Sequence, residues 1–171
     1  MRSRCAARSS CSKARVLSGI AGPRIPRLIK KDTMSFSPRF KYPPAIANTL
    51  GFDLIDAGNG SATFEIVTDV ARHGNPAGTV HGGVLCDVAD AAIGTAHATG
   101  LGEGESLTSV DLQISFFRPV WNDRLRAIAR PIHRGHTLSR YICDIISSDG
   151  KLVAQVTSTV MTLRAEKASG R

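Results

Sequence analysis

One helix constrains the fold of this chain more than any other segment. It is predicted within residues 75–98, where two glycines follow a histidine and a long run without proline comes after them. At about 100° per residue, its apolar side chains gather on one face, and Asp90 lies near the middle of the opposite face. The residues of the apolar face are Val84, Leu85, Val88, Ala89, Ala92 and Ala96. Other elements must cover this face.

The segments that flank this helix have the sequence patterns of β-strands. Apolar and polar residues alternate in several of them, and Gly, Asn and Asp mark the turns. A short helix is predicted over 38–50, with Gly51 at its C-terminal end, and the Pro and Gly of 69–80 indicate an irregular loop. The predicted strands cover 52–57, 61–68, 106–120, 123–134, 137–148 and 151–164.

Consecutive strands after one long helix favour an α+β fold, in which an antiparallel sheet wraps the long central helix. Pro131 indicates that its strand is an edge strand or contains a bulge. In the strand over 106–120, alternation predicts that Val110, Leu112, Ile114 and Phe116 share one face.

The chain of 171 residues suits one domain with a single core, since 42% of it is hydrophobic. Its net charge of +8 comes from residues 1–31, which contain nine Lys and Arg and no acid. The remainder has 13 basic and 14 acidic residues, a net charge of −1, which argues against a nucleic-acid partner. No apolar run is long enough to span a membrane. The predicted parts are a basic extension over 1–35, a domain over 36–165 and a frayed polar tail over 166–171.

The extension is rich in Arg and Ser, and it contains Pro23 and Pro26. Three interpretations fit this composition. In the first, translation starts at Met34 and the segment is not made. In the second, the segment is an organelle transit peptide. In the third, it is a basic arm for nucleic acid or anionic lipid, although it has no aromatic residue for stacking. We expect a cytoplasmic location, or a mitochondrial or other organellar one if the segment is a transit peptide.

The four cysteines do not have the spacing of a metal site. Cys5 and Cys11 belong to the extension, and no CxxC pair occurs, which argues against zinc and against a disulfide framework. Cys86 in the helix and Cys143 in a strand are predicted to be packed thiols, typical of a reducing compartment.

The start of the central helix, His81-Gly82-Gly83, is the first candidate for chemistry. The N–H groups at a helix start have no partner within the helix. Together with the helix dipole, they favour an anion or an oxygen that becomes negative during a reaction. Glycine also lets a ligand approach the backbone closely. The alternative is that these glycines only allow tight packing against a strand.

Asp90 is the second candidate. Mid-helix acids are usually solvated or salt-bridged, but the neighbours of Asp90 are small or apolar, a setting that suits a base or a nucleophile. Asp87 is a rival, although its place nearer the helix start suggests that it complements the dipole. Asp90 follows His81 by nine residues, about 13.5 Å along the axis and turned by roughly 180°. If both act on one carbon, a second subunit must supply the carboxylate.

These motifs together resemble one enzyme family. NPAGTVHGG over 75–83, Asp90, SVDLQISFFRPV over 109–120 and RGHTL over 134–138 are similar to the hotdog-fold acyl-CoA thioesterases of the phenylacetate-degradation (PaaI-like) type. The similarity extends over about residues 40–165. It implies a homodimer or dimer of dimers with active sites at the subunit interface. It implies no metal or redox cofactor, because CoA is part of the substrate.

The resemblance also implies a role for each site residue. Gly82 N–H holds the oxyanion, and Asp90 of the partner subunit acts as nucleophile or as the base that activates water. Asn75 orients the water or the thioester, and Ser109 hydrogen-bonds the water beside Asp90. His81 shapes the loop by hydrogen bonding. Taken alone, Asn75 also fits a turn residue and Ser109 an ordinary strand hydroxyl.

Substrate contacts are implied at the helix entrance and near the CoA phosphates. Arginines bind phosphates well, although arginines at strand ends are usually solvated. The implied contact residues are Gly83, Arg134, Gly135, His136, Thr137 and Arg118.

We therefore expect a homo-oligomeric hydrolase that cleaves an acyl- or aroyl-CoA thioester to free acid and CoA. A hydratase of the same fold is disfavoured, because the histidine-containing loop motif of those enzymes is missing. A non-catalytic acyl-CoA-binding or regulatory protein is the alternative from another class, and the presence of Asp90 argues against it. Candidates for the acyl pocket are Phe40, Ile46, Phe116 and Phe117.

Overall fold

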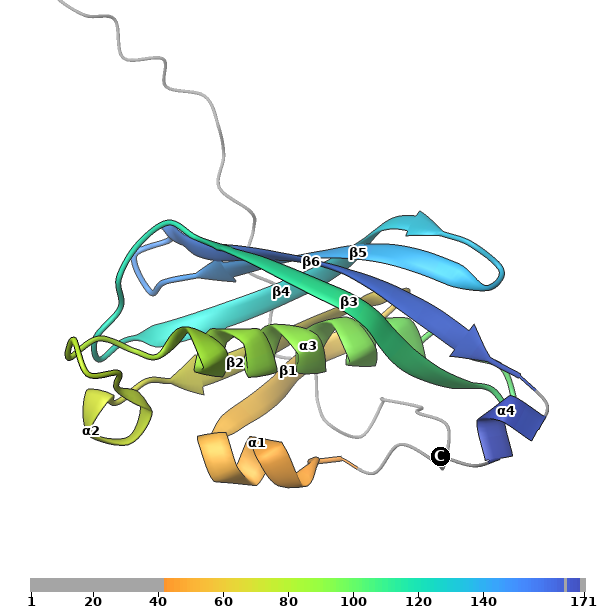
Figure 1. Cartoon of the computed structure of the whole chain (residues 1–171), viewed down its shortest axis with the longest axis horizontal. Helices are drawn as coiled ribbons and strands as arrows, with labels where there is room; N and C mark the ends of the chain where they lie inside the picture. Colours follow the sequence, from red (N-terminus) through yellow and green to blue (C-terminus); the bar gives the residue numbers. More distant parts are fainter. Residues whose placement is uncertain (1–41, 165, 170–171) are drawn as a thin grey trace, which may run out of the picture.

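The computed structural model describes residues 42–164 and 166–169 (Figure 1). The predicted extension over 1–35 and Phe40 lie outside the described residues. In chain order, the elements are α1 (Ala45–Leu50), β1 (Phe52–Gly58), β2 (Ser61–Val67), α2 (Val70–His73), α3 (Gly82–Ala98), β3 (Ser106–Phe116), β4 (Arg124–Arg134), β5 (Leu138–Ile146), β6 (Leu152–Leu163) and α4 (Glu166–Ser169).

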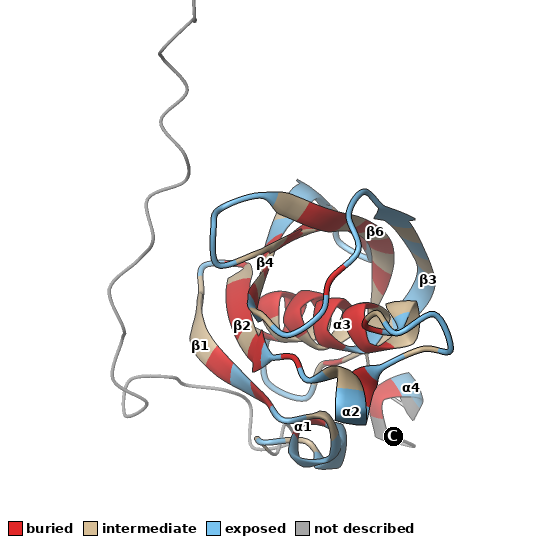
Figure 2. Ribbon diagram, turned by 90° about the vertical axis from the view of Figure 1, so that its left-hand side faces the viewer, coloured by how far each residue is buried: buried red, intermediate tan, exposed pale blue. Residues whose placement is uncertain are grey.

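The strands form one antiparallel sheet that curves around α3, as predicted (Figure 2). The helix has 17 residues and contacts all six strands. Every residue of its predicted apolar face is buried, and so is Ile93. Ala89, Ala92 and Ala96 have no exposed surface, and their small side chains let the helix lie close to the sheet. This is the hotdog arrangement of a helix wrapped by a sheet.

The order of the strands is β1-β2-β4-β5-β6-β3. β3 follows α3 directly in the chain but lies at the edge of the sheet, paired with β6 alone among the described strands. Of the two alternatives predicted at Pro131, the bulge is confirmed. Pro131 lies at a register shift between β4 and β5, and β4 is not an edge strand of the sheet.

Two short helices were not predicted. α2 lies in the loop that was interpreted as irregular, because the carboxylate of Asp69 accepts a hydrogen bond from Ala71 N–H (2.9 Å) and caps a single helical turn. α4 lies in the tail that was expected to fray, and its Ala168 is buried. At α1, Gly51 ends the helix as predicted, with a φ of 77° that favours glycine.

The predicted face of the third strand is wrong at Val110. Leu112 and Ile114 pack against the core, whereas the side chain of Val110 is 55% exposed. The cause is a register shift between Ser109 and Asp111, where β3 has one residue more than β6. This β-bulge interrupts the alternation, so residues on its two sides change faces.

Candidate active site

The entrance of α3 is formed by His81 and the two glycines after it. His81 is the N-cap residue, and its Nδ1 accepts a hydrogen bond from Gly83 N–H (2.9 Å). Gly82 is the first helical residue, so its N–H has no partner within the helix. Among the hydrogen bonds of the described residues, none is donated by Gly82 N–H. This N–H is the one at the entrance that can meet a ligand oxygen.

An open cleft of about 390 Å³ lies beside this entrance. Its walls are mostly apolar, and Arg118 supplies the one charged side chain among its lining residues. The lining residues are Asn75, Thr79, Val80, Gly82, Leu85, Phe116, Phe117, Arg118, Pro119 and Val120. Of the candidates for the acyl pocket, Phe116 and Phe117 line this cleft, and Ile46 lies away from it on α1.

Gly82 also has a packing reason to be glycine. A Cβ atom built on Gly82 would lie 2.7 Å from the ring atom Cζ of Phe116, which is closer than side chains tolerate. The Phe116 ring over the helix start supports the packing interpretation of this glycine, and the ligand-approach interpretation stays a prediction.

Asn75 uses its side chain within its own turn. Its Nδ2 donates to Thr79 Oγ1 (2.9 Å), while its Oδ1 accepts from the N–H groups of Ala77 (2.9 Å) and Thr79 (3.2 Å). Asn75 lines the cleft next to Gly82, so the turn that it holds forms one wall of the candidate site. Its orientation of water or thioester stays a prediction.

His73 fixes the same loop, and sequence reasoning missed it. Its side chain is buried, with Nδ1 accepting from Asp69 N–H (3.0 Å) and Nε2 2.9 Å from the carbonyl oxygen of Leu50. Its own carbonyl accepts from His81 N–H (2.8 Å). A single histidine in a loop gave no signal for this role, because both of its partners are backbone groups that any sequence provides.

Asp90 and Ser109 lie next to each other, but Ser109 bonds Asp90 directly, whereas the resemblance implied a bond to water beside Asp90, a role that stays a prediction. Ser109 Oγ donates to Asp90 Oδ1 at 2.8 Å, across from α3 to β3. The other carboxylate oxygen of Asp90 accepts no hydrogen bond from a described residue. The pair lines a second open cavity of about 340 Å³, together with Cys86, Asp87, Val110, Asp111 and Leu112.

The surroundings of the Cys86 thiol in this cavity disfavour its thiolate form. Burial raises the pKa of Cys86, and the nearby carboxylates of Asp87 and Asp90 raise it further, so the thiol form is favoured.

The two cavities lie at different places along α3 and β3. Gly82 and Asp90 are eight residues apart, about 12 Å along the axis of α3. Strand β3 lines both cavities, through Ser109 at one and Phe116 at the other. Both cavities therefore adjoin the strand whose outer edge pairs with no described strand.

The segment over 134–137 lies elsewhere, in the hairpin between β4 and β5 near the C-terminal end of α3. Arg134, Gly135 and His136 line a small cavity of about 100 Å³ with His97 and Glu105. The guanidinium of Arg134 packs over Gly60 and Gly100, where a Cβ on Gly100 would meet it at 2.3 Å. Thr137 contributes its carbonyl oxygen, which accepts from Thr162 N–H (2.9 Å).

Over residues 42–164 and 166–169, no three His, Cys, Asp or Glu side chains gather as a metal site would require. In the same residues, no helix combines the length and apolar character of a membrane span.

A central helix wrapped by a six-stranded antiparallel sheet, with a polar pair and an open helix start along one sheet edge, defines a hotdog-fold protein with a candidate hydrolytic site. Residues 77–154 match the model of the thioesterase superfamily. A phenylacetic acid degradation-related protein from Ralstonia eutropha JMP134 is 35% identical, over 69% of this chain and 89% of that one, with a TM-score of 0.63. The chain belongs to the thioesterase superfamily.

Two further relatives agree with this assignment. The E. coli PaaI protein from the phenylacetic acid degradation operon is 28% identical over 73% of this chain and 87% of that protein, with a TM-score of 0.65. A Haemophilus influenzae protein named "Putative esterase" is 31% identical over 90 residues, which are 52% of this chain and 65% of that relative. The match thus spans just under two thirds of that relative's length. Family membership supports hydrolysis of ester or thioester bonds in general.

Proposed function

We propose that this protein hydrolyses acyl- or aroyl-CoA thioesters to the free acid and CoA. The active site would form between two copies of the chain, with Gly82 of one copy facing Asp90 of the other. The observation that carries the proposal is the Asp90–Ser109 hydrogen bond, which lies at the same sheet edge as the unpartnered N–H of Gly82. The thioesterase family supports a thioester substrate, and the phenylacetic acid degradation operon of one relative supports an aromatic acyl group.

The helix entrance would stabilise the negative charge of the reaction. Attack on the thioester carbonyl turns its oxygen into an oxyanion, and Gly82 N–H at the positive end of the helix dipole is suited to hold it. His81 keeps the entrance in shape by binding Gly83 N–H, which leaves Gly82 N–H for the substrate. Gly83, the next residue of the helix, would contact the substrate through its backbone.

Asp90 would act in one of two ways, and both keep the atoms in balance. As a base, it takes a proton from water, the hydroxide oxygen bonds to the carbonyl carbon, and the carbon–sulfur bond breaks to release CoA as thiolate. As a nucleophile, its carboxylate bonds to that carbon and expels the thiolate, and water then cleaves the resulting anhydride. In both cases, Ser109 holds Oδ1 and leaves the other oxygen to react.

The cleft beside Gly82 would receive the acyl group. Its apolar walls, with Phe116 and Phe117, suit an aliphatic or aromatic chain, and Arg118, which also lines the cleft, would meet a phosphate of CoA. Arg134, Gly135, His136 and Thr137 are a second candidate for CoA contacts, at the other end of the helix. No metal or redox cofactor enters this mechanism, since its groups are the chain's own and water.

The partner in this proposal is a second copy of the chain. β3 has a free edge among the described strands, and Val110, Phe116 and Phe117 expose apolar surface along it or just beyond it. Pairing two such edges gives a dimer, and two dimers could join further. We do not expect a nucleic-acid or membrane partner, and a cytoplasmic location stays a prediction.

A panel of thioesters tests the proposal. CoA release is measured from phenylacetyl-, benzoyl-, short-chain and long-chain acyl-CoA, with the wild-type protein and Asp90→Asn side by side. We expect turnover by the wild type, and at least a hundredfold lower kcat for the variant, because the amide is neither basic nor nucleophilic. Asp87→Asn, one turn earlier, is the matched control and should keep its activity. Wild-type rates in Asp90→Asn would overturn the assignment, and saturable binding without turnover would favour a binding protein.

A further inference from the structure

The bulge in β3 decides which way Ser109 points. Ser109 pairs with Val160 of β6, and Asp111 pairs with Thr159, the neighbour of Val160 on the antiparallel strand. Val110 therefore has no partner in the register. On one side of the bulge, Ser109 faces α3 and reaches Asp90. On the other side, Leu112 and Ile114 face the core.

Without the bulge, these residues could not share a face. In a regular strand, side chains alternate, so Ser109 and Leu112 would point to opposite faces of the sheet. Burial of Leu112 and Ile114 would then turn Ser109 to the outer face, away from Asp90. The Ser109–Asp90 hydrogen bond therefore depends on the extra residue.

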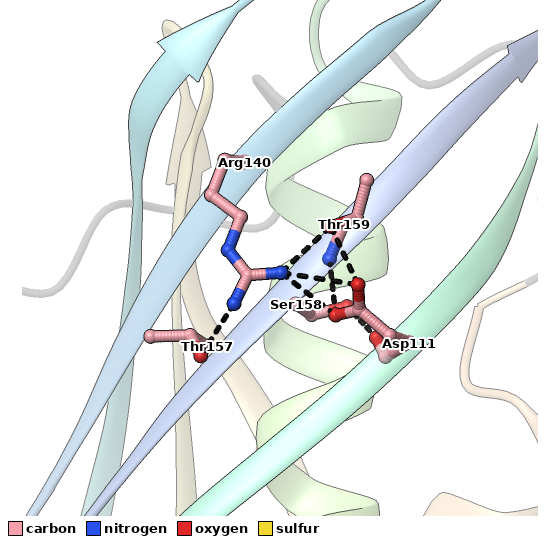
Figure 3. Close-up of polar contacts among 5 residues, drawn as sticks. All are labelled: Asp111, Arg140, Thr157, Ser158 and Thr159. Atoms are coloured by element: carbon pink, nitrogen blue, oxygen red, sulfur yellow. Dashed lines mark hydrogen bonds and ion pairs between the residues drawn. The ribbon is translucent and has the colours of Figure 1, made fainter.

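Five residues hold the strand in this conformation, and we call them the Asp111 clamp: Asp111, Arg140, Thr157, Ser158 and Thr159 (Figure 3). Figure 3 shows the Asp111 carboxylate lying between β3 and β6, with the Arg140 side chain reaching it from β5. The carboxylate accepts from Arg140 Nη1 (2.8 and 3.1 Å), from Thr159 N–H (3.0 Å) and from Thr159 Oγ1 (2.7 Å).

The backbone of Asp111 is held from the inner face as well. Ser158, which is fully buried, donates from Oγ to the carbonyl oxygen of Asp111 at 2.6 Å. Arg140 is held in turn by Thr159 Oγ1 (2.7 Å) and Thr157 Oγ1 (2.9 Å). Residue 111 is thus fixed by both its side chain and its carbonyl, directly after the extra residue.

The clamp stays charged at neutral pH. Hydrogen bonding from Thr159 holds the pKa of Asp111 below its usual range, and the Arg140 guanidinium adds to this. The ionised carboxylate of Asp111 can therefore accept these bonds at neutral pH.

We propose that the Asp111 clamp is a positioning device for the active site, which maintains the bulge at Val110 and so directs the Ser109 hydroxyl to Asp90. Asp111 is a positioning residue: it also lines the Asp90 cavity, but its carboxylate is bound to Arg140 and Thr159 on the outer face of the sheet. This inference rests on the proposed function of Asp90 and Ser109, and it adds the element that places them together.

A crystal structure of Asp111→Ala tests the geometry independently of any activity. We expect the register shift between Ser109 and residue 111 to be lost or moved, with Ser109 Oγ no longer within hydrogen-bond distance of Asp90. If the alanine variant does not fold, Asp111→Asn replaces it and should show a weaker form of the same change. An unchanged bulge with an intact Ser109–Asp90 bond would overturn the inference.

A double-mutant cycle tests the route through Ser109. We expect Asp111→Ala to lower kcat about ten- to a hundredfold with little change in KM, since small displacements of catalytic groups have effects of this size. Asp111→Asn should restore part of the rate. In the Ser109→Ala background, Asp111→Ala should cause no further loss. Fully additive losses would show a general structural effect and contradict the proposal.

Asp144→Ala is the matched control. Asp144 also lies on the outer face, accepts from Gln155 Nε2 (2.8 Å) and pairs with Arg130 (3.8 Å), but it lies on β5 and does not touch β3, where the bulge at Val110 is. We expect its kcat to equal that of the wild type. A loss equal to that of Asp111→Ala would contradict a specific role. If Asp90→Asn keeps its turnover, the proposed function fails, and the crystal structure still decides the clamp.

Discussion

His97 is a buried titratable residue whose surroundings disfavour its charged form. Its side chain is 6% exposed near the C-terminal end of α3, and its Nε2 lies 2.9 Å from Thr162 Oγ1. Among the described residues, its Nδ1 has no hydrogen-bond partner. Burial lowers the pKa of His97, and the charge of Arg134 lowers it further. The folded protein therefore resists protonation of this ring.

This predicts a loss of stability in mild acid. The unfolded chain takes up a proton near the ordinary pKa of about 6.5, before the folded chain does. Stability is therefore fully present above about pH 6.5 and falls as the pH drops toward the folded pKa. We expect the Tm to fall between about pH 7 and pH 5, and to fall less in His97→Gln. His133→Gln, at an exposed histidine, is the control. An equal pH dependence in His97→Gln would contradict the prediction.

At the residue scale, sequence reasoning found groups whose chemistry follows from their type. Asp90 stood out as an acid among small apolar neighbours, and Gly82 as a glycine at a helix start. In the structure, Ser109 is hydrogen-bonded to Asp90. Only the family resemblance associated these two residues, because the strand pattern alone gave no reason to do so. The role of His73 could not be predicted, because its partners are backbone groups that any sequence provides, and that of Arg140 could not, because Asp111 lies far from it in the chain.

At the scale of the elements, α3 holds the fold together by contacts with every strand. Its apolar face was predictable, since helical periodicity depends on one segment alone. The bulge in β3 and the place of β3 at the sheet edge were not, because both depend on pairing with β6. Local pattern thus identified the strands, α1 and α3 but missed the short helices α2 and α4, and contacts between elements decided where the alternation of β3 breaks.

The packing of α3 predicts where the fold is most sensitive. Ile93 has no exposed surface, so Ile93→Ala would leave a cavity and should cost about 2–5 kcal/mol of the free energy of unfolding. Ile46→Ala is the same change on α1, where Ile46 is 43% exposed, and should cost less than about 0.5 kcal/mol. Urea denaturation at one fixed protein concentration measures both. Equal losses would contradict this description of the core.

At the scale of the whole molecule, the two halves of the candidate site do not meet within one chain. Gly82 and Asp90 lie about 12 Å apart along α3, and they line different cavities. In a symmetric dimer, a two-fold axis beside β3 would bring the Gly82 cleft of each copy to the Asp90 cavity of the other. The central claim is therefore that neither copy is active alone.

Subunit mixing tests this claim most directly. Asp90→Asn lacks the carboxylate, and Gly82→Pro lacks the N–H. Proline is favourable at a helix start, but its Cβ would crowd Phe116, so the folding and dimer formation of each variant are checked first. Each variant alone should be inactive toward acyl-CoA. Refolded together in equal amounts, half of the dimers contain one intact site, so we expect about a quarter of the wild-type rate. Well-folded mixed dimers that recover no activity would contradict a site shared between two chains.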